Sequence, residues 1–305
     1  MSNIVIQMNQ SDLSKLHQHY ERAIVKKPAN ALFLAKVNQT TITAYKSGKV
    51  MFQGQHAETE ASKWSTTLPN KTSTNTVNDH AYAPTKSLFH TSHIGTDEAG
   101  TGDYFGPITV SAVYVPDNKI EELKQLGITD SKTLTDDNIA RLAKKLVKLR
   151  IPYTLLTLNN KKYNQLQKKG WNQGKMKAML HHHAIEKLIA KIGMHAPILI
   201  DQFCQPSVYS KYIHTENMQL HENTYFMTKA ESHSTSVAAA SIIARAKFVK
   251  EMDLLSSKLG ITVPKGASSK VDETCAYLIK KHGMTILEDV AKVHFANTEK
   301  AKKYI

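Results

Sequence analysis

The sequence predicts a small α+β domain followed by a larger α/β domain with a mixed central sheet. From residue 93 onward, apolar runs of strand length alternate with longer segments whose apolar residues recur at helical spacing. Before residue 66, one amphipathic helix precedes several short strands. Between the two, residues 66–92 are rich in Thr, Ser and Asn and show no periodicity, so they are predicted to form a linker.

Residues 1–65 make up the first predicted domain. Ser11 can cap a helix over residues 12–24. Three short strands are predicted to follow, over residues 31–37, 41–45 and 50–53. Eight Lys and Arg against four Asp and Glu give this domain a net charge of +4, and it has no acid cluster. It is therefore expected to bind a polyanion rather than to catalyse.

Residues 93–305 make up the larger predicted domain. Its strands are predicted over residues 108–115, 153–158, 197–200 and 224–228. Its helices are predicted over residues 136–149 with Thr135 as the cap, over 175–192, over 235–254 and, as two shorter helices, between 272 and 291. The run 197–200 is apolar throughout, which is typical of a strand in the middle of a sheet that is covered on both faces.

The composition indicates a basic protein. The chain has 305 residues, with 40 Lys and Arg against 26 Asp and Glu, a formal charge of +14. This charge favours a polyanionic partner such as nucleic acid, although a merely basic soluble protein fits it as well. Only Cys204 and Cys275 are present, which argues against a disulfide scaffold or a Cys-based zinc site. No secretory signal or membrane-length apolar run is visible, so we expect a cytoplasmic protein without a membrane partner.

One stretch combines two adjacent acids with three glycines: Asp97 and Glu98 precede Gly100, Gly102 and Gly106. Adjacent side chains on a regular strand point to opposite faces, so these acids are expected to share a site only if the strand ends or bulges there. Glycine permits such a distortion. A divalent metal site is one interpretation, because a cation lets neighbouring carboxylates stay ionised, and a solvated acidic turn is the other.

Two further acids stand at the ends of apolar segments. Asp201 follows the strand at 197–200, and Glu231 precedes the Ala-rich start of the helix at 235–254. Each has a plainer interpretation, Asp201 as a turn or capping residue and Glu231 as a partner of the helix dipole. With the adjacent pair they nevertheless form the donor set of two divalent cations, Mg²⁺ or Mn²⁺, of the kind that supports phosphodiester cleavage.

Five motifs together resemble the type 2 ribonucleases H, and ribonuclease HIII in particular. They are D-E-A-G-T-G-D-Y-F-G-P at 97–107, I-T-D-S-K-T-L at 128–134, N-Q-G-K-M-K-A-M-L at 172–180, I-D-Q-F at 200–203 and K-A-E-S-H-S-T-S-V-A-A-A-S-I-I-A-R at 229–245. Ribonuclease HII usually has G-R-G where this chain has Gly100-Thr101-Gly102, and Asp where it has Glu231. Both departures, and a small N-terminal domain resembling the TATA-box-binding-protein fold, are similar to the HIII pattern.

The resemblance implies a ribonuclease-H-like fold and an endonuclease that hydrolyses the RNA strand of RNA–DNA hybrids by a two-metal mechanism, leaving 5′-phosphate and 3′-hydroxyl ends. The implied catalytic and metal-binding residues are Asp97, Glu98, Asp201 and Glu231. The implied substrate-binding residues are Gly100, Thr101, Gly102, Ser131, Lys132, Asn172, Gln173 and Lys175, each of which is otherwise a solvated loop or helix-start residue. The alternative for the whole chain is a non-catalytic nucleic-acid-binding protein. In either case we expect a monomer.

The tract His181-His182-His183 has the composition of a metal-binding segment. Three consecutive positions on a helix point in different directions around its axis, so these histidines cannot chelate one ion together. They are expected to be solvated or to face the substrate groove.

Overall fold

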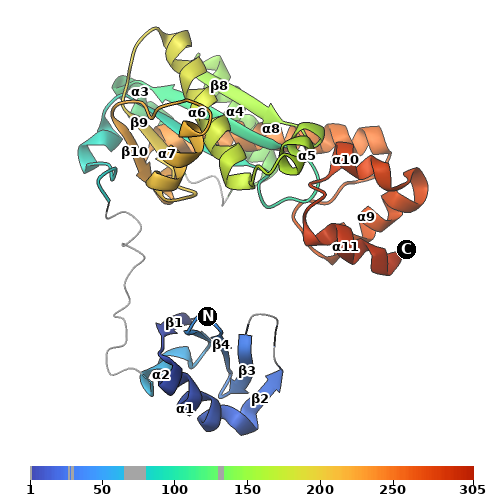
Figure 1. Ribbon diagram of the computed structural model, residues 1–305. Coiled ribbons are helices and arrows are strands. Elements are labelled where there is room, and N and C mark those ends of the chain that lie inside the picture. Colours follow the sequence, from blue (N-terminus) through green and yellow to red (C-terminus); the bar gives the residue numbers. More distant parts are fainter. Residues whose placement is uncertain (1, 27, 29–30, 65–79, 130–133) are drawn as a thin grey trace. The chain divides into compact units, whose positions relative to one another are not determined.

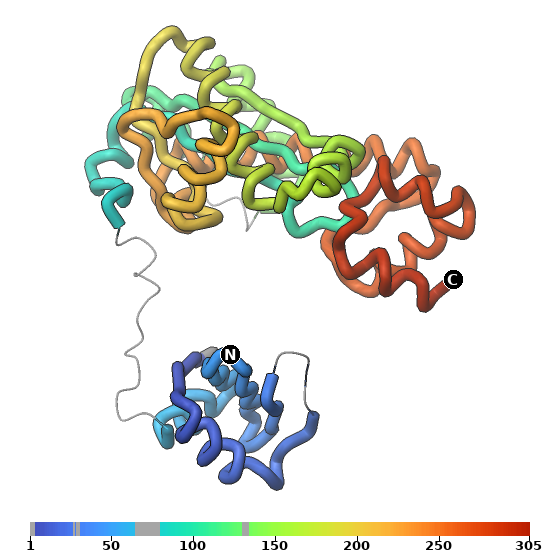
Figure 2. Tube along the Cα trace, viewed as in Figure 1, coloured from blue at the N-terminus to red at the C-terminus, as the bar shows by residue number. Residues whose placement is uncertain are grey.

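The structure is a computed structural model that divides into two compact units, Met1–Thr76 and Val77–Ile305. It describes the whole chain except residues 1, 27, 29–30, 65–79 and 130–133 (Figures 1 and 2). Two of the expected substrate contacts, Ser131 and Lys132, lie outside the described residues. Each unit has a hydrophobic core of its own.

The first unit is a five-stranded antiparallel sheet with helices, as the α+β prediction requires. The strands lie in the order β1-β5-β4-β3-β2. The elements are β1 (Ser2–Gln7), α1 (Gln10–Tyr20), β2 (Ile24–Lys26), β3 (Ala31–Val37), β4 (Thr40–Tyr45), β5 (Lys49–Gly54) and α2 (Ala57–Ser62). Alternate strand residues, Phe33 and Phe52 among them, pack with Leu16 of α1 to form the core.

The first helix differs from its prediction at both ends. Its cap is Asn9 and not Ser11, because the Asn9 side chain accepts a hydrogen bond from the Asp12 N–H at 2.9 Å. Both residue types are good caps, so composition alone did not separate them. The α-helix ends at Tyr20, where the 3-10 helix Glu21–Ala23 follows and leads into Ile24–Lys26, which pair with β3. The sequence prediction also missed β1 and α2.

The second unit is built on a mixed five-stranded sheet in the order β10-β9-β6-β7-β8, which confirms the predicted fold class. Its strands are β6 (His93–Ala99), β7 (Ile108–Val115), β8 (Tyr153–Leu158), β9 (Ile198–Asp201) and β10 (Thr224–Met227). Pairs β6–β9 and β9–β10 are parallel, whereas β6–β7 and β7–β8 are antiparallel.

The helices of the second unit are α3 (Asp117–Gln125), α4 (Asp136–Lys148), α5 (Asn160–Lys168), α6 (Gln173–Ile192), α7 (Pro206–His214), α8 (Thr235–Leu259), α9 (Ser269–His282), α10 (Leu287–Val290) and α11 (Ala296–Ala301). The cap of α4 is Thr135, as predicted, with its side chain accepting from the Asn138 N–H. Within the described ranges, no helix combines the length and the apolar character needed to cross a membrane.

Two long helices, α6 and α8, cover opposite faces of this sheet (Figure 1). Along β7, Val110 and Ala112 belong to the core under α6, whereas Val113 and Val115 belong to the core under α8. Strand β6 lies very close to α8 because Gly95 has no side chain: a Cβ there would stand 2.2 Å from a backbone nitrogen of the helix.

The predicted linker, residues 66–92, is described only from residue 80, and that part packs on the second unit. Leu88, in the 3-10 helix Lys86–His90, is buried. The backbone carbonyl of Tyr82 accepts a hydrogen bond from the Phe226 N–H of β10 at 2.9 Å. These contacts make residues 80–92 part of the second unit. The prediction assigned them to the linker because the segment is mostly polar, and its few apolar side chains, which anchor it, did not stand out.

Candidate active site

The two adjacent acids lie at an opening in the sheet. Strand β6 stays paired with β7 through Ala99, but its pairing with β9 stops at Thr96. Asp97 and Glu98 follow directly, where one edge of β6 has been released, and Asp201 is the last residue of β9. The strand was expected to end or bulge at the acids, but β6 remains a regular strand through both of them. What ends before the acids is its pairing with β9.

Asp97 and Glu98 point to opposite faces of the sheet, as neighbours on a regular strand do. Asp97 is hydrogen-bonded by Ser241 of α8. The carboxylate of Glu98 meets α6 instead, with Oε1 2.8 Å from Lys177 Nζ and Oε2 2.8 Å from His181 Nε2. The site therefore spans the end of the strand and takes partners from both helical layers.

Asp97 is buried among other acids. Its burial, followed by the charges of Asp201 and Glu98, raises the pKa of its carboxyl well above the usual value. Oδ1 of Asp97 accepts the Glu98 N–H at 2.7 Å, which fixes the carboxylate. A divalent cation beside Asp97 would offset this repulsion, so the residues present fit the metal that an all-carboxylate site implies.

The pKa of Glu98 is shifted in the opposite direction from that of Asp97. Burial alone would raise its pKa, but the hydrogen bonds and charges of His181 and Lys177 lower the pKa to about 2. Nδ1 of His181 is in turn 2.8 Å from the hydroxyl of Thr96, so the imidazole is held at both nitrogens. His181 and His182 are both buried, so neither is solvated as one of the two expectations had it, whereas His181 faces the acid cluster through Glu98. The sequence did not reveal that this face of α6 packs on the sheet.

The remaining two acids are tied to the same place. Glu231 is buried in the 3-10 helix η5 (Ala230–Ser232), which follows β10. The Ser241 hydroxyl lies 3.2 Å from Glu231 Oε2 and is also a hydrogen-bond partner of Asp97. Oδ1 of Asp201 accepts the Ala230 N–H at 2.8 Å. The structure therefore brings all four acids together near the C-terminal ends of β6, β9 and β10.

In the glycine segment after β6, Gly100 is required by the backbone conformation, whereas Gly102 borders open space. Gly100 has a φ of 86°, and a Cβ on it would lie 2.2 Å from the Pro107 carbonyl oxygen. A Cβ on Gly102 would meet no heavy atom within 4 Å. Gln173 at the start of α6 donates its side-chain amide to the Thr101 carbonyl at 2.9 Å. The expected substrate contacts on this segment and on α6 are therefore neighbours.

Two other expected substrate contacts on α6 already have protein partners. Asn172 is the N-cap of the helix, and its Oδ1 accepts the Lys175 N–H at 2.8 Å. The ammonium of Lys175 pairs with Glu216 at 2.5 Å and lies 4.1 Å from the centre of a Trp171 ring. A phosphate contact by Lys175 would have to compete with Glu216, whereas Asn172 is exposed.

A buried lysine supports the glycine segment from the C-terminal part of the chain, and sequence reasoning missed it. Lys292 is fully buried and donates to the backbone carbonyls of Asp103 at 2.6 Å and Gly106 at 2.7 Å. Burial lowers the pKa of its ammonium to about 7. Asn160 donates to the same Gly106 carbonyl at 2.9 Å. A single Lys between the apolar residues Ala291 and Val293 carries no signal for such a role.

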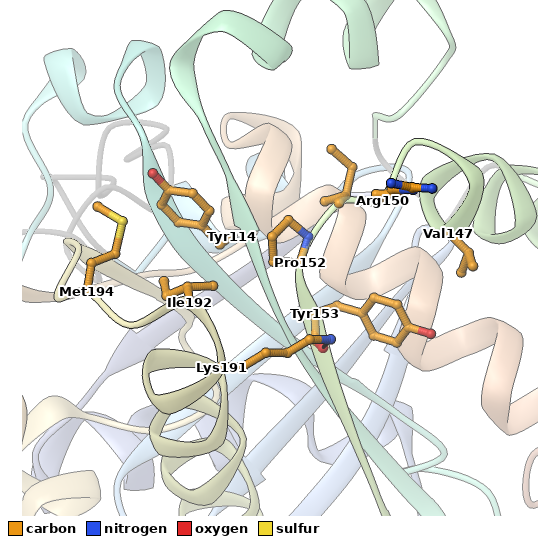
Figure 3. Close-up of a pocket in the computed structure, with 9 residues that line it drawn as sticks. Tyr114, Val147, Arg150, Pro152, Tyr153, Lys191, Ile192 and Met194 are labelled. Carbon is orange, nitrogen blue, oxygen red and sulfur yellow. Dashed lines mark hydrogen bonds between the residues drawn. The ribbon is translucent and has the colours of Figure 1, made fainter.

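The pocket drawn in Figure 3 is not part of this site. It has a volume of about 550 Å³ and is lined by side chains such as Tyr114, Tyr153 and Lys191 (Figure 3). Tyr114 pairs with Ile94, near the start of β6, whereas the acids follow Thr96 towards its other end. The pocket therefore opens at the opposite end of the strands from the carboxylates.

Comparison with known proteins places this site in a family. The family model for ribonuclease HII matches residues 94–298, and a model for a domain of unknown function, DUF3378, matches residues 3–77. The chain belongs to the ribonuclease HII family and is therefore a metal-dependent endoribonuclease of the ribonuclease H type. This finding excludes the non-catalytic binding protein that the charge alone left open.

Within this family the chain belongs with the ribonucleases HIII. It is 53% identical over 308 residues to the ribonuclease HIII of Oceanobacillus iheyensis, with 100% of both chains covered. It is 50% identical over 311 residues to that of Bacillus cereus strain ATCC 14579, again with 100% of both covered. The crystal structure of Bst-RNase HIII in complex with Mn²⁺ matches with 43% identity and a TM-score of 0.70, covering 99% of each chain.

A more distant structure shares the fold. Aquifex aeolicus RNase H3 matches with a TM-score of 0.55 at 24% identity, covering 95% of this chain. Together with the Bst-RNase HIII match, it confirms a ribonuclease-H-like domain preceded by a small domain resembling the TATA-box-binding-protein fold.

Proposed function

We propose that the chain cuts the RNA strand of RNA–DNA hybrids, with Asp97, Glu98, Asp201 and Glu231 binding two Mg²⁺ or Mn²⁺ ions. The observation that carries this proposal is the convergence of four carboxylates, of which Asp97 has its pKa raised by burial and by its acidic neighbours. Such ions would supply stabilisation of the attacking and leaving oxygens in phosphodiester hydrolysis. With water attacking phosphorus and the 3′-oxygen leaving, the products would carry 5′-phosphate and 3′-hydroxyl ends. Hard carboxylate oxygens suit these ions.

The surrounding residues set what each acid does in this proposal. Asp97 is the central ligand, because the charges of both Asp201 and Glu98 act on it. Lys177 and His181 keep Glu98 ionised and orient its carboxylate towards the opening. They are positioning residues, since they reach the metal site only through Glu98.

Substrate recognition is proposed for the backbone of Gly100-Thr101-Gly102, which would lie against the minor groove of the hybrid and sense 2′-hydroxyl groups. The open space beside Gly102 supports this role, because no heavy atom of the described chain lies within 4 Å of where its Cβ would stand. Asn172, Gln173 and Lys175 would contribute phosphate or sugar contacts beside this segment, with Ser131 and Lys132 as further sequence-based candidates. The first unit would hold the hybrid through its net positive charge.

The test is cleavage of four matched substrates with Mg²⁺: an RNA–DNA hybrid, duplex DNA, duplex RNA and free nucleotides. We expect cleavage of the hybrid alone. Asp97→Asn should lower turnover by orders of magnitude and leave hybrid binding intact, because the amide is nearly isosteric but lacks the charge that holds a cation. Asp253→Asn, which changes an exposed acid of α8, is the matched control. Normal cleavage by Asp97→Asn in excess Mg²⁺ would refute the site assignment. Action as a monomer in the cytoplasm stays a prediction.

A further inference from the structure

A second group of possible metal ligands lies outside the acid cluster. His182 and Glu186 are one helical turn apart on α6, and His221 precedes β10. Each offers one ligand atom, and these three atoms all lie within 4.8 Å of one another. The rings of His182 and His221 are stacked, with centroids 5.1 Å apart and planes at 22°. Residues remote in sequence are thus brought together without any role in the proposed hydrolysis.

The spacing of the first two ligands suits a tetrahedral ion. His182 Nε2 and Glu186 Oε1 are 3.4 Å apart, which is long for a charged hydrogen bond. Two ligand atoms at about 2.0–2.1 Å from a tetrahedral Zn²⁺ are separated by about 3.3 Å. The observed pair therefore already spans one edge of such a site, and a small rotation of the exposed Glu186 side chain is enough to adjust it.

The third residue of the group, His221, carries a buried nitrogen, Nε2, for which the described part of the chain supplies no hydrogen-bond partner. The hydroxyl of Tyr209 is likewise buried without a hydrogen-bond partner among the described residues, and the charge of Glu186 acts on it. Buried polar atoms are normally satisfied, and exceptions often mark a missing water or ion. The backbone carbonyl of His221 is fixed by the Thr224 hydroxyl at 2.7 Å, so the loop that carries it is anchored.

The surroundings supply a route from solvent and the right protonation state. His221 borders an open pocket of about 430 Å³, lined by residues 195–198 and 221–223. Burial lowers the pKa of both His182 and His221, so each imidazole is neutral, as a metal ligand must be. Two imidazoles and one carboxylate favour a transition metal over Mg²⁺, which prefers oxygen ligands and octahedral geometry.

We propose that His182, Glu186 and His221 form a transition-metal site, with Zn²⁺ as its best-fitting ion and water as the fourth ligand. This ion would join α6 to the connection between α7 and β10. The site is separate from the acid cluster, because successive residues of a helix are rotated by about 100° and His181, not His182, faces Glu98. Its place on α6 makes it a brace for the helix that positions Glu98.

The test is a calorimetric Zn²⁺ titration of the metal-free full chain in excess Mg²⁺, which competes at the acid cluster. Four proteins are compared: the unchanged chain, His221→Ala, Glu186→Gln and His183→Ala. We expect the unchanged chain and His183→Ala to bind one more Zn²⁺ than the other two, or to bind it at least about tenfold more tightly. His183 is the matched control because it is the next histidine of the same tract and lies outside the proposed ligand set, its Nδ1 being 3.4 Å from Glu186 Oε2 rather than from the Oε1 that faces His182.

A second readout is the thermal unfolding of the same proteins with and without Zn²⁺. Binding to the folded chain alone should raise the melting temperature of the unchanged chain and of His183→Ala, and should do so less for His221→Ala and Glu186→Gln. Glu186→Gln changes an exposed side chain, so it keeps the test valid should His221→Ala fold poorly. Equal zinc binding by all four proteins would overturn the proposal, as would loss of binding in His183→Ala alone.

Discussion

Replacing each of the two adjacent acids by its amide should change stability in opposite directions when no metal is present. Glu98→Gln removes the carboxylate that pairs with Lys177 and His181 of α6, whose side chains are 11% and 0% exposed. Breaking a buried pair leaves the remaining charge uncompensated and is strongly destabilising. Asp97→Asn instead removes one of several like charges, so the folded second unit should become more stable.

The size of the Glu98 effect follows from its pKa. The carboxylate of Glu98 pairs with Lys177 and His181, and this pairing lowers its pKa from 4.5 to about 2. Each pKa unit corresponds to about 1.4 kcal/mol, so the ionised carboxylate stabilises the folded unit by about 3 kcal/mol at neutral pH. Glu98→Gln should lower the free energy of unfolding by about that amount, within the range of about 3–5 kcal/mol that is typical of broken buried pairs.

The pH dependence separates the two acids further. A lowered pKa stabilises the fold above the unfolded value, here about 4.5, and this contribution is lost as the pH falls through the folded value of about 2. Asp97 behaves in the opposite way, because its pKa is raised: the folded unit gains stability as the pH falls and Asp97 takes up a proton. Asp97→Asn should remove that gain.

The assay is urea unfolding in EDTA, followed by tryptophan fluorescence in a Trp64→Phe background. Trp171 then reports on the second unit alone, since the chain has two tryptophans. A Glu98→Gln protein as stable as the unchanged chain would refute the pairing with α6. If Asp97→Asn lost as much stability as Glu98→Gln, the claim that the charge of Glu98 stabilises the fold while that of Asp97 destabilises it would be refuted.

Four further outcomes are expected. Gly100→Ala should lower both stability and cleavage because of its positive φ and the close Pro107 carbonyl, whereas Gly102→Ala should keep stability, so that any fall in its kcat/KM reports on substrate contact. Lys292→Met should lower the free energy of unfolding by about 1–3 kcal/mol, because the Asp103 carbonyl loses this donor and the Gly106 carbonyl keeps only that of Asn160, and it should abolish the rise in stability between about pH 7 and 10.5 that the lowered pKa of Lys292 implies, as measured by urea unfolding. A chain beginning at residue 77 should lose hybrid affinity, increasingly so as salt rises, yet keep some cleavage at high substrate, and unchanged affinity would contradict a binding role of the first unit. Hybrids with RNA tracts should be cut well and single embedded ribonucleotides poorly, because Thr101 cannot supply the donors of an Arg; equal kcat/KM on both would contradict this.

The sequence predicted the apolar strands and the longest helices of the second unit, but it missed β6, which carries Asp97 and Glu98, and helices α3, α5, α7 and α11. The strands at 108–115 and 153–158 have the predicted bounds, and the fold class is confirmed. The first unit was predicted less completely, because β1 and α2 are short and lack strong periodicity. Their positions depend on pairing with β5 and on packing against the sheet, which are tertiary effects.

The acids were predictable as a group because Asp97 and Glu98 precede a glycine-rich segment and Asp201 and Glu231 stand at the ends of apolar segments, but the residues that support them were not. Lys177 stood inside the motif at 172–180 and His181 in the histidine tract that follows it, yet nothing in the sequence placed them beside Glu98. Lys292 is separated by almost two hundred positions from the carbonyl groups that it holds, at Asp103 and Gly106. Contacts of this kind arise only when the tertiary structure brings distant residues together, and local patterns do not encode them.

The regular course of β6 through its two acids has a consequence for how such a site can diverge. Because α6 holds Glu98 and α8 holds Asp97, a substitution on one helix can change the charge around one carboxylate and spare the other. Two neighbouring positions thus behave as separately adjustable ligands. A one-residue insertion in β6 before Asp97 would instead exchange the faces of both acids at once and give each the other's helix. Substitutions on α6 or α8 can therefore change the metal preference gradually, whereas the length of β6 before Asp97 must stay fixed.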